Sequence, residues 1–416
     1  MNTKDDLCKL EKQMAKRLHA ISPKEVDPEY QTLAARINFG GSLYLPRIFK
    51  KAFTLEQARV MIEFNMSSDE IASILGISKE EVERNAAKYQ VEAIAKKLNL
   101  DKKTVEKHIQ YAFELGFAFP TRGGWRLARS FGQLRDSMTN PKFDEQLGDE
   151  FFDLWKAYER LEAYPAMIGP KKMSGIGPQA PSPFFRAIPA RKSLKNIPNV
   201  VPEDNLEEIL KKASRIAVVN CACKRLVRDR DPNIPVEVCI IMDNVAEHNI
   251  RRGTAKVISI EEALAIQEMA NDAGLISFPQ GPRQVCHCHW SCCGVIAPFV
   301  MTGRPLQELL CASCYRPVVD PDKCTGCQTC VTRCQFEAID MIRYPGAGKQ
   351  EKLKAWVDPE KCRGCGLCVI KCPVGARTMV QVNTGVPAPA DSLAELGVGV
   401  SRGKDLETNS LMTRPL

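Results

Sequence analysis

The chain has 416 residues, of which 44% are hydrophobic and 26% are charged, the balance of an ordinary soluble protein with several domains. A net charge of +8 is small for this length and identifies no class of partner. No apolar run is long enough to cross a bilayer, and residues 1–18 lack the apolar core of a signal peptide. We therefore expect a cytoplasmic protein without membrane insertion, in a compartment that keeps thiols reduced.

Residues 1–145 carry a helical pattern, because apolar side chains recur in them at helix-compatible spacing. Two stretches within them, residues 54–88 and 91–128, each resemble a helix–turn–helix unit. The second also resembles a winged helix, with a candidate recognition helix from Lys103 to Leu115 and a wing over residues 117–127. We expect this helical, winged-helix-like region to form its own domain.

Nucleic-acid binding is one interpretation of the winged-helix-like unit. Four of its basic side chains would then meet phosphate or base edges: Lys102, Lys103, Lys107 and Arg122. Residues 1–150, however, contain 24 Lys and Arg against 22 Asp and Glu, without the strong basic excess of a dedicated DNA-binding domain. The fold also serves as a protein-docking module, and fold alone does not fix function. We favour a docking or structural role and keep nucleic-acid binding as the alternative.

The segment after the helical region is expected to be an extended connector over residues 146–204. Eight prolines between Pro165 and Pro202 interrupt any helix there. An α/β middle domain follows over residues 205–315, with a strand before Cys221, a second strand around Cys239, and a helix over residues 259–273. Ser259 and Glu262 have the spacing of a capping box at the start of that helix. The Pro-, Gly- and Ser-rich tail, residues 385–416, is expected to be flexible.

The 18 cysteines are the most informative feature of the composition. Cys8 stands alone and is interpreted as an ordinary thiol, whereas the other 17 lie between Cys221 and Cys372. In a reducing compartment, such a block indicates metal or cluster ligation rather than disulfides.

An internal repeat with an offset of 38 residues occupies residues 316–384. KCTGCQTCVTRCQFEAIDM begins at Lys323 and KCRGCGLCVIKCPVGARTM at Lys361, and each copy has the spacing C-x2-C-x2-C-x3-C. This pattern resembles the bacterial-type double ferredoxin domain, a small α+β fold in which the fourth cysteine of each run ligates the cluster of the other half. The resemblance implies two [4Fe-4S] clusters. One would be held by Cys324, Cys327, Cys330 and Cys372, and the other by Cys362, Cys365, Cys368 and Cys334.

The repeat departs from the ferredoxin pattern in two places. Gln335 follows Cys334, where the family has proline, and the missing proline is expected to loosen this turn. The segment between the halves is longer than in compact ferredoxins and is predicted to form a hairpin around residues 345–348. Zinc ribbons are the alternative, but zinc-binding cysteine pairs usually stand well apart. Nearby basic residues are expected to be solvated or to steer an acidic partner: Lys349, Lys352, Lys354, Arg363, Lys371 and Arg377.

A second block of nine cysteines precedes the repeat. It resembles a Cys-rich extension found before ferredoxin domains in some multi-cluster proteins of anaerobes, and this resemblance implies at least one further iron–sulfur cluster. Its candidate ligands are Cys221, Cys223, Cys239, Cys286, Cys288, Cys292 and Cys293. A structural zinc site is the alternative, and a larger cluster is weakly suggested by a single Cys-Cys-Gly step.

Other residues of this second block receive separate interpretations. His287 and His289 are expected to orient loops or bond backbone rather than to ligate. Cys311 and Cys314 belong either to this block or to the ferredoxin boundary.

Three functions remain open. The first is an electron-transfer protein or subunit that passes single electrons between a redox partner and an anaerobic oxidoreductase. The second is a cluster-sensing transcriptional regulator that uses the helix–turn–helix, and the third is a catalytic cluster with an open iron site. No nucleotide-binding loop, nucleophile elbow or acid–base pair is found, so we expect no catalytic activity of the chain on its own.

Overall fold

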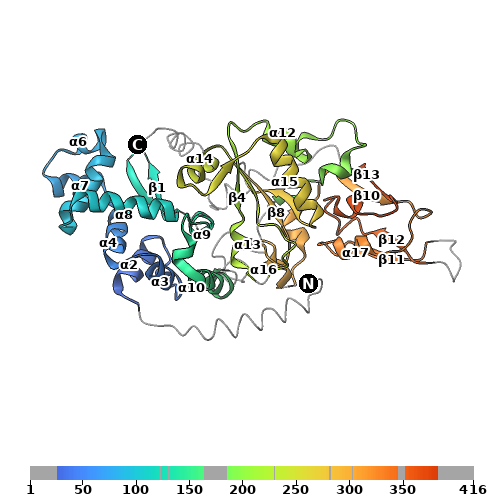
Figure 1. Ribbon diagram of the computed structural model, residues 1–416, viewed down its shortest axis with the longest axis horizontal. Helices are drawn as coiled ribbons and strands as arrows, with labels where there is room; N and C mark the ends of the chain where they lie inside the picture. The colour runs from blue at the N-terminus through green and yellow to red at the C-terminus, as the bar shows by residue number, and fades with distance from the viewer. Residues whose placement is uncertain are drawn as a thin grey trace.

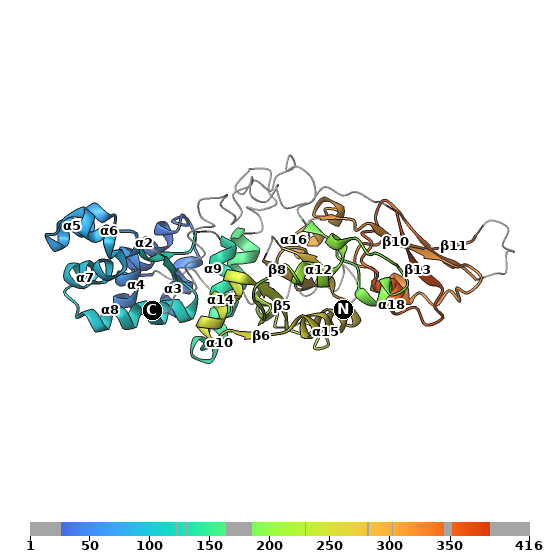
Figure 2. The same cartoon turned by 90° about the horizontal axis from the view of Figure 1, so that it is seen from above.

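The computed structural model describes residues 26–121, 123–129, 131–163, 185–228, 230–280, 283–301, 303–344 and 352–382. It is 47% helical and 17% strand, which confirms the mixed α+β class. Outside the described residues lie Cys8, Arg122, residues 345–348 and the tail from residue 385. Figures 1 and 2 show three regions in a row, with the helical N-terminal region and the cysteine repeat at opposite ends of a central sheet.

The N-terminal region is built round one apolar core that includes Phe49, Phe117 and Trp155. Its helices are α2 (Pro28–Arg36), α3 (Leu45–Ala52), α4 (Leu55–Ile62), α5 (Ser68–Leu75), α6 (Lys79–Arg84), α7 (Ala86–Leu98), α8 (Lys102–Leu115), α9 (Phe131–Met138) and α10 (Asp144–Tyr158). Helix α10 crosses the domain boundary expected at residue 145, because it buries Phe151 and Trp155 in this same core. The connector expected from residue 146 therefore begins later than the sequence indicates.

A helix–helix–hairpin unit occupies the stretch that resembles a winged helix. Helices α7 and α8 are followed by the antiparallel strands β1 (Ala118–Thr121) and β2 (Gly124–Leu127). Gln90 on α7 fixes this hairpin, since its Nε2 donates to the carbonyl of Trp125 and its Oε1 accepts from the Trp125 N–H. Of the candidate DNA-contacting residues, Lys102 pairs with Glu92 at 3.1 Å, and Lys103 and Lys107 are exposed. DNA binding by this unit stays a prediction.

The middle region is an antiparallel five-stranded sheet in the order β6-β4-β5-β8-β7. The strands are β4 (Ile216–Asn220), β5 (Glu237–Met242), β6 (Ala255–Val257), β7 (Ile276–Pro279) and β8 (Gln284–Cys288). The helices around it are α12 (Leu206–Leu210), α13 (Ala222–Leu226), α14 (Asp243–Arg252), α15 (Ile260–Asp272) and α16 (Ala297–Met301). The capping box of Ser259 and Glu262 is confirmed at the start of α15. The short strands β3 (Phe185–Arg186) and β9 (Leu310–Cys311) pair in parallel beside this sheet.

The C-terminal repeat folds as two interlocked halves. Strand β10 (Tyr315–Val319) pairs with β13 (Arg377–Gln381), and β11 (Ile339–Ile342) pairs with β12 (Lys354–Val357). Helices α17 (Thr329–Arg333) and α18 (Leu367–Ile370) follow the cysteine loops. Each half therefore supplies one strand to each pair. Strands β11 and β12 pair on either side of the predicted hairpin, and its turn at residues 345–348 lies outside the described residues. No described helix anywhere in the chain has the length and apolar character needed to cross a membrane.

Arg252 fastens the helical region to the middle region. Its side chain is fully buried, and its guanidinium donates to the carbonyls of Phe113 at 3.1 Å, Ser137 at 2.9 Å and Asn140 at 3.0 Å. These acceptors lie at or just beyond the C-terminal ends of α8 and α9, where a cation is favoured by the helix dipole. The two regions thus share a buried polar contact rather than a solvated hinge.

Gln335 fastens the cysteine repeat to the middle region. Its Nε2 donates to the carbonyls of Gly274 at 2.6 Å and Cys288 at 3.2 Å, and its Oε1 accepts the Trp290 N–H at 2.9 Å. Arg333 adds bonds to the carbonyls at the end of α15. The expectation that the turn after Cys334 is loose is therefore wrong, because Gln335 is held by three hydrogen bonds that proline could not make.

Replacing Gln335 with alanine should loosen this junction. The Trp290 N–H would lose its acceptor and two carbonyls would lose a donor, so local opening should become easier by about 1–3 kcal/mol. Amide hydrogen exchange at Trp290 should accelerate accordingly. Gln307→Ala is the matched control, because it removes an exposed bond to the Lys361 carbonyl. Equal exchange at Trp290 in both variants would contradict this role of Gln335.

Candidate metal centres

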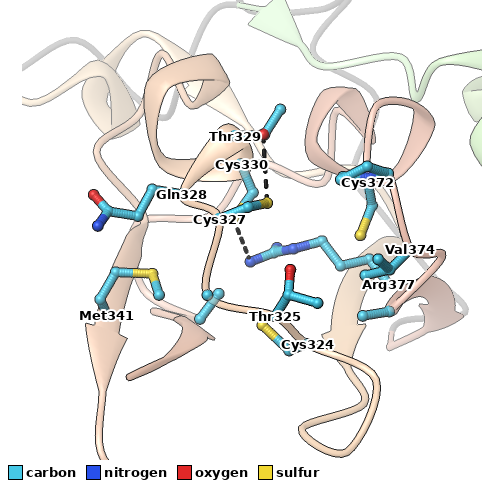
Figure 3. A pocket seen from close by; sticks show the side chains of 14 residues that line it. Cys324, Thr325, Cys327, Gln328, Thr329, Cys330, Met341, Cys372, Val374 and Arg377 are labelled. Atoms are coloured by element: carbon cyan, nitrogen blue, oxygen red, sulfur yellow. Dashed lines mark hydrogen bonds between the residues drawn. The ribbon is translucent and has the colours of Figure 1, made fainter. Parts of the chain in front are cut away.

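The first cavity lies between the two halves of the repeat. Four thiols line it: Cys324, Cys327, Cys330 and Cys372. Figure 3 shows Cys372 facing the 324–330 loop across this cavity. About 330 Å³ here is not filled by protein atoms, part of it open to solvent. Cys327 is exposed, so this cavity reaches the surface.

The second cavity repeats this arrangement with the runs exchanged. Its thiols are Cys334, Cys362, Cys365 and Cys368, and its unfilled volume is also about 330 Å³. Each cavity therefore takes three thiols from one run and the fourth from the other. Burial raises the pKa of Cys368 to about 12 and that of Cys365 well above its ordinary value. Apolar surroundings oppose bare thiolates here, so deprotonation must be driven by a bound cation.

Glycines allow the two cysteine loops to turn tightly. Gly326 and Gly364 have φ of +73° and +68°, in the left-handed region that favours glycine. A Cβ on Gly326 would lie 2.5 Å from the Leu353 carbonyl oxygen, and one on Gly364 would lie 2.0 Å from that of Tyr315. Both conformation and space therefore require glycine at these two positions.

Arg377 lies across the first cavity (Figure 3), and it is only 4% exposed. Its Nη2 donates to Cys330 Sγ at 3.0 Å, and its guanidinium also lies near Cys368 of the second cavity. Burial opposes its charge, but the thiolates of Cys368 and Cys330 raise the pKa of Arg377 above its ordinary value. The expectation that Arg377 is a solvated, partner-steering residue is therefore wrong.

The residues of the first cavity fit an iron–sulfur cluster. Nη1 of Arg377 is buried without a hydrogen-bond partner in the described structure, which leaves a donor that inorganic sulfide could accept. Four thiols and a glycine loop complete a donor set suited to iron.

The other basic residues named as steering candidates have varied surroundings. Lys371 pairs with Asp272 at 3.0 Å, Lys354 donates to the Cys324 carbonyl, and Arg363 donates to the Glu360 carbonyl. Lys352 is exposed, and Lys349 lies outside the described residues.

A third group of thiols lies in the middle region. Six buried or half-buried cysteines lie in a closed ring, each beside the next: Cys221, Cys223, Cys293, Cys288, Cys286 and Cys239. They come from the end of β4, the start of α13, strands β5 and β8, and the turn after β8. Hydrogen bonds from Cys221 and Cys286 hold the pKa of Cys239 well below its ordinary value. We call this group the thiol ring.

Three buried cations surround the thiol ring. Lys224 is 1% exposed, and its Nζ donates to the His287 carbonyl beside the ring. Burial opposes its charge, but nearby thiolates, Cys221 first, raise the pKa of Lys224 well above its ordinary value. Arg135, from α9, donates to Cys223 Sγ at 3.2 Å. Lys156, from α10, is also buried near Cys223, and burial lowers its pKa to about 8.

Five nearby candidates lie outside the thiol ring. The thiol of Cys292 donates to the His289 carbonyl, and the imidazole of His289 bonds Ser291 in its own loop. His287 alternates with Cys286 and Cys288 along β8, so its ring lies on the other face of the sheet, where it bonds Ser277. Cys314 sits beside the buried Arg186–Asp204 pair, and Cys311 belongs to β9. The histidines therefore bond neighbouring side chains, in agreement with a role in positioning loops.

Three residues of these sites have no signal in the cysteine pattern itself. Arg377 and Gln335 could be found by aligning the two copies, since Arg377 stands where the first copy has Ile339, and Gln335 where the second has Pro373. Lys224 has no comparable signal, because its role depends on strands brought together by the fold.

Comparison with known proteins identifies the C-terminal repeat. The family model of the 4Fe-4S dicluster domain matches residues 317–379, which contain all eight cysteines of the two cavities. No curated protein and no solved structure matches the chain. The matched segment includes neither the helical region nor the thiol ring. The chain thus carries a 4Fe-4S dicluster domain near its C-terminus, which indicates iron–sulfur electron transfer.

Proposed function

We propose that this chain is an iron–sulfur electron-transfer protein or subunit that passes single electrons between a redox partner and an anaerobic oxidoreductase. The observation that carries the proposal is the pair of four-thiol cavities, each with its fourth thiol from the other run. In each cavity the four lining thiolates would ligate one [4Fe-4S] cluster. The clusters, when bound, supply reversible one-electron storage.

The surroundings of the two cavities support different roles for them. The first cavity carries the exposed Cys327, whose thiol bonds Thr329. The second is covered by the middle region, since the Ala190 N–H donates to the Cys365 carbonyl and Ser313 bonds the Gly364 carbonyl. We therefore propose that a soluble partner docks at the first cavity, because electron exchange between proteins needs a close, accessible site.

The transcriptional-regulator alternative gains no support from the helical region. Its described lysines largely pair with carboxylates, as Lys97 does with Glu63 and Lys79 with Asp69. The ends of α8 and α9 in the helical region are already in contact with the middle region through Arg252. A docking or structural role agrees better with this packing.

The exchange of the fourth cysteine can be tested by paired substitutions. Cys334→Ser and Cys365→Ser should disturb the same cluster, so the double variant should lose no more iron than about four per chain. Cys334→Ser with Cys327→Ser should disturb both clusters and lose about eight. Anaerobic iron and sulfide quantification with EPR of the reduced protein provides the measurement. Additive loss in the first pair would contradict the exchanged ligand sets, and a wild type without acid-labile sulfide would contradict the function itself.

Arg377 should raise the reduction potential of the dicluster domain. Its buried charge beside Cys330 and Cys368 favours the more negative, reduced state. Arg377→Ile, which copies Ile339 of the other half, should lower the potential of at least one cluster by about 60 mV, a tenfold change for one electron. EPR-monitored redox titration measures this shift. Arg377→Lys keeps the charge and should retain most of the wild-type potential, and unchanged midpoints in Arg377→Ile would refute the role.

A further inference from the structure

The thiol ring is a built site outside the matched dicluster domain. Its members come from separate segments between residues 221 and 293, and the sheet brings them together at the ends of β4, β5 and β8. Thiols packed only as small apolar groups would not need this convergence. Six adjoining thiols in one reducing interior are a ligand set.

The number and arrangement of the thiols favour a cluster over a single zinc ion. Zinc takes four ligands, all about 2.3 Å from one point when they are thiolates. In the ring each thiol lies beside two neighbours, and the six come from five separate places in the chain. The ligands of a cluster bind different irons and so need no common point.

The buried cations also require a charged occupant. Lys224 is 1% exposed, its Nζ donates to the His287 carbonyl beside the ring, and it forms no ion pair with a described carboxylate. Arg135 brings a second cation to Cys223, although Glu159 and Asp136 share its charge. A buried ammonium without a counter-charge is strongly unfavourable. Thiolates bound to iron supply that negative charge, whereas neutral thiols would not.

We propose that the thiol ring holds a third iron–sulfur cluster, with Lys224 and Arg135 balancing the charge of its thiolates. Its ligands are drawn from the six ring cysteines, and Cys292 lies outside the ring with its thiol on the His289 carbonyl. This site is a metal centre in its own right and does not depend on the two clusters of the proposed function.

A second part of the inference, that the ring exchanges electrons with the second cavity, rests on the proposed function. Cys286, Cys288 and Cys293 belong to the same apolar core that packs against Cys334 and other thiols of that cavity. Gln335, bonded covalently to Cys334, donates to the Cys288 carbonyl at 3.2 Å. A short bonded route therefore joins a ring member to a ligand of the second cavity.

The test is iron, sulfide and zinc quantification of the anaerobically purified full chain, with EPR of the reduced state. The wild type should contain more iron than the roughly eight of two four-iron clusters. Cys239→Ala, in the centre of the sheet, should lose this surplus and keep the dicluster signals, which also shows that the chain has folded. Cys292→Ala, a buried neighbour outside the ring, should keep the full iron content.

Each remaining outcome decides the proposal. About eight irons in the wild type, zinc instead of the surplus iron, or full iron in Cys239→Ala would overturn it. Should Cys239→Ala fail to fold, Lys224→Met keeps all six thiols and should shift the potential of the additional EPR signal downward without moving the dicluster signals; no shift would refute the role of Lys224. Cys365→Ser should lose dicluster iron and keep the surplus iron of the ring. That result would show that the two sites bind iron separately. Iron at the thiol ring of a protein whose dicluster domain binds no iron would refute the proposed function. It would leave the proposal of a cluster in the thiol ring intact.

Discussion

Thiolate ligands carry negative charge into the interior of a protein, and the interior must balance that charge. In this chain the balance comes from buried cations placed directly at the thiols. Arg377 bonds Cys330 and lies near Cys368 between the two cavities of the repeat, and Lys224 lies among the thiols of the ring. Arg377 reaches its thiols from β13, and Lys224 reaches the ring from α13. The fold is therefore organised by charge compensation as much as by apolar packing.

The same requirement explains why the regions are packed together rather than tethered. Arg135 belongs to the N-terminal helical region but donates to Cys223 of the middle region, so the ring is completed by a domain that carries none of its cysteines. Arg252 reaches in the opposite direction and caps helix ends of the N-terminal region. These reciprocal contacts give the winged-helix-like region a structural task at the ring.

At the other end, Gln335 connects the dicluster domain to the ring. The position after the fourth cysteine is proline in one copy and glutamine in the other, and the glutamine contacts the middle region. Its three hydrogen bonds place the second cavity against the core that contains Cys288. The first cavity carries Cys327, which is exposed to solvent. Of the three thiol sites, the ring thus lies in the interior and the first cavity opens to the surface.

The sequence by itself determined the eight cysteines of the repeat and their spacing, because ligand spacing is a local property, and the ferredoxin resemblance implied the exchange of the fourth cysteine. It also located the strands before Cys221 and around Cys239 and the capped helix at Ser259. Only the tertiary structure decided which six middle-region thiols meet, that Cys292 does not join them, and that Arg377 is buried rather than solvated. The end of the helical region was likewise misplaced, because α10 belongs to it through packing and not through composition. These features depend on residues far apart in the chain, whose distances are set by strand order and domain packing.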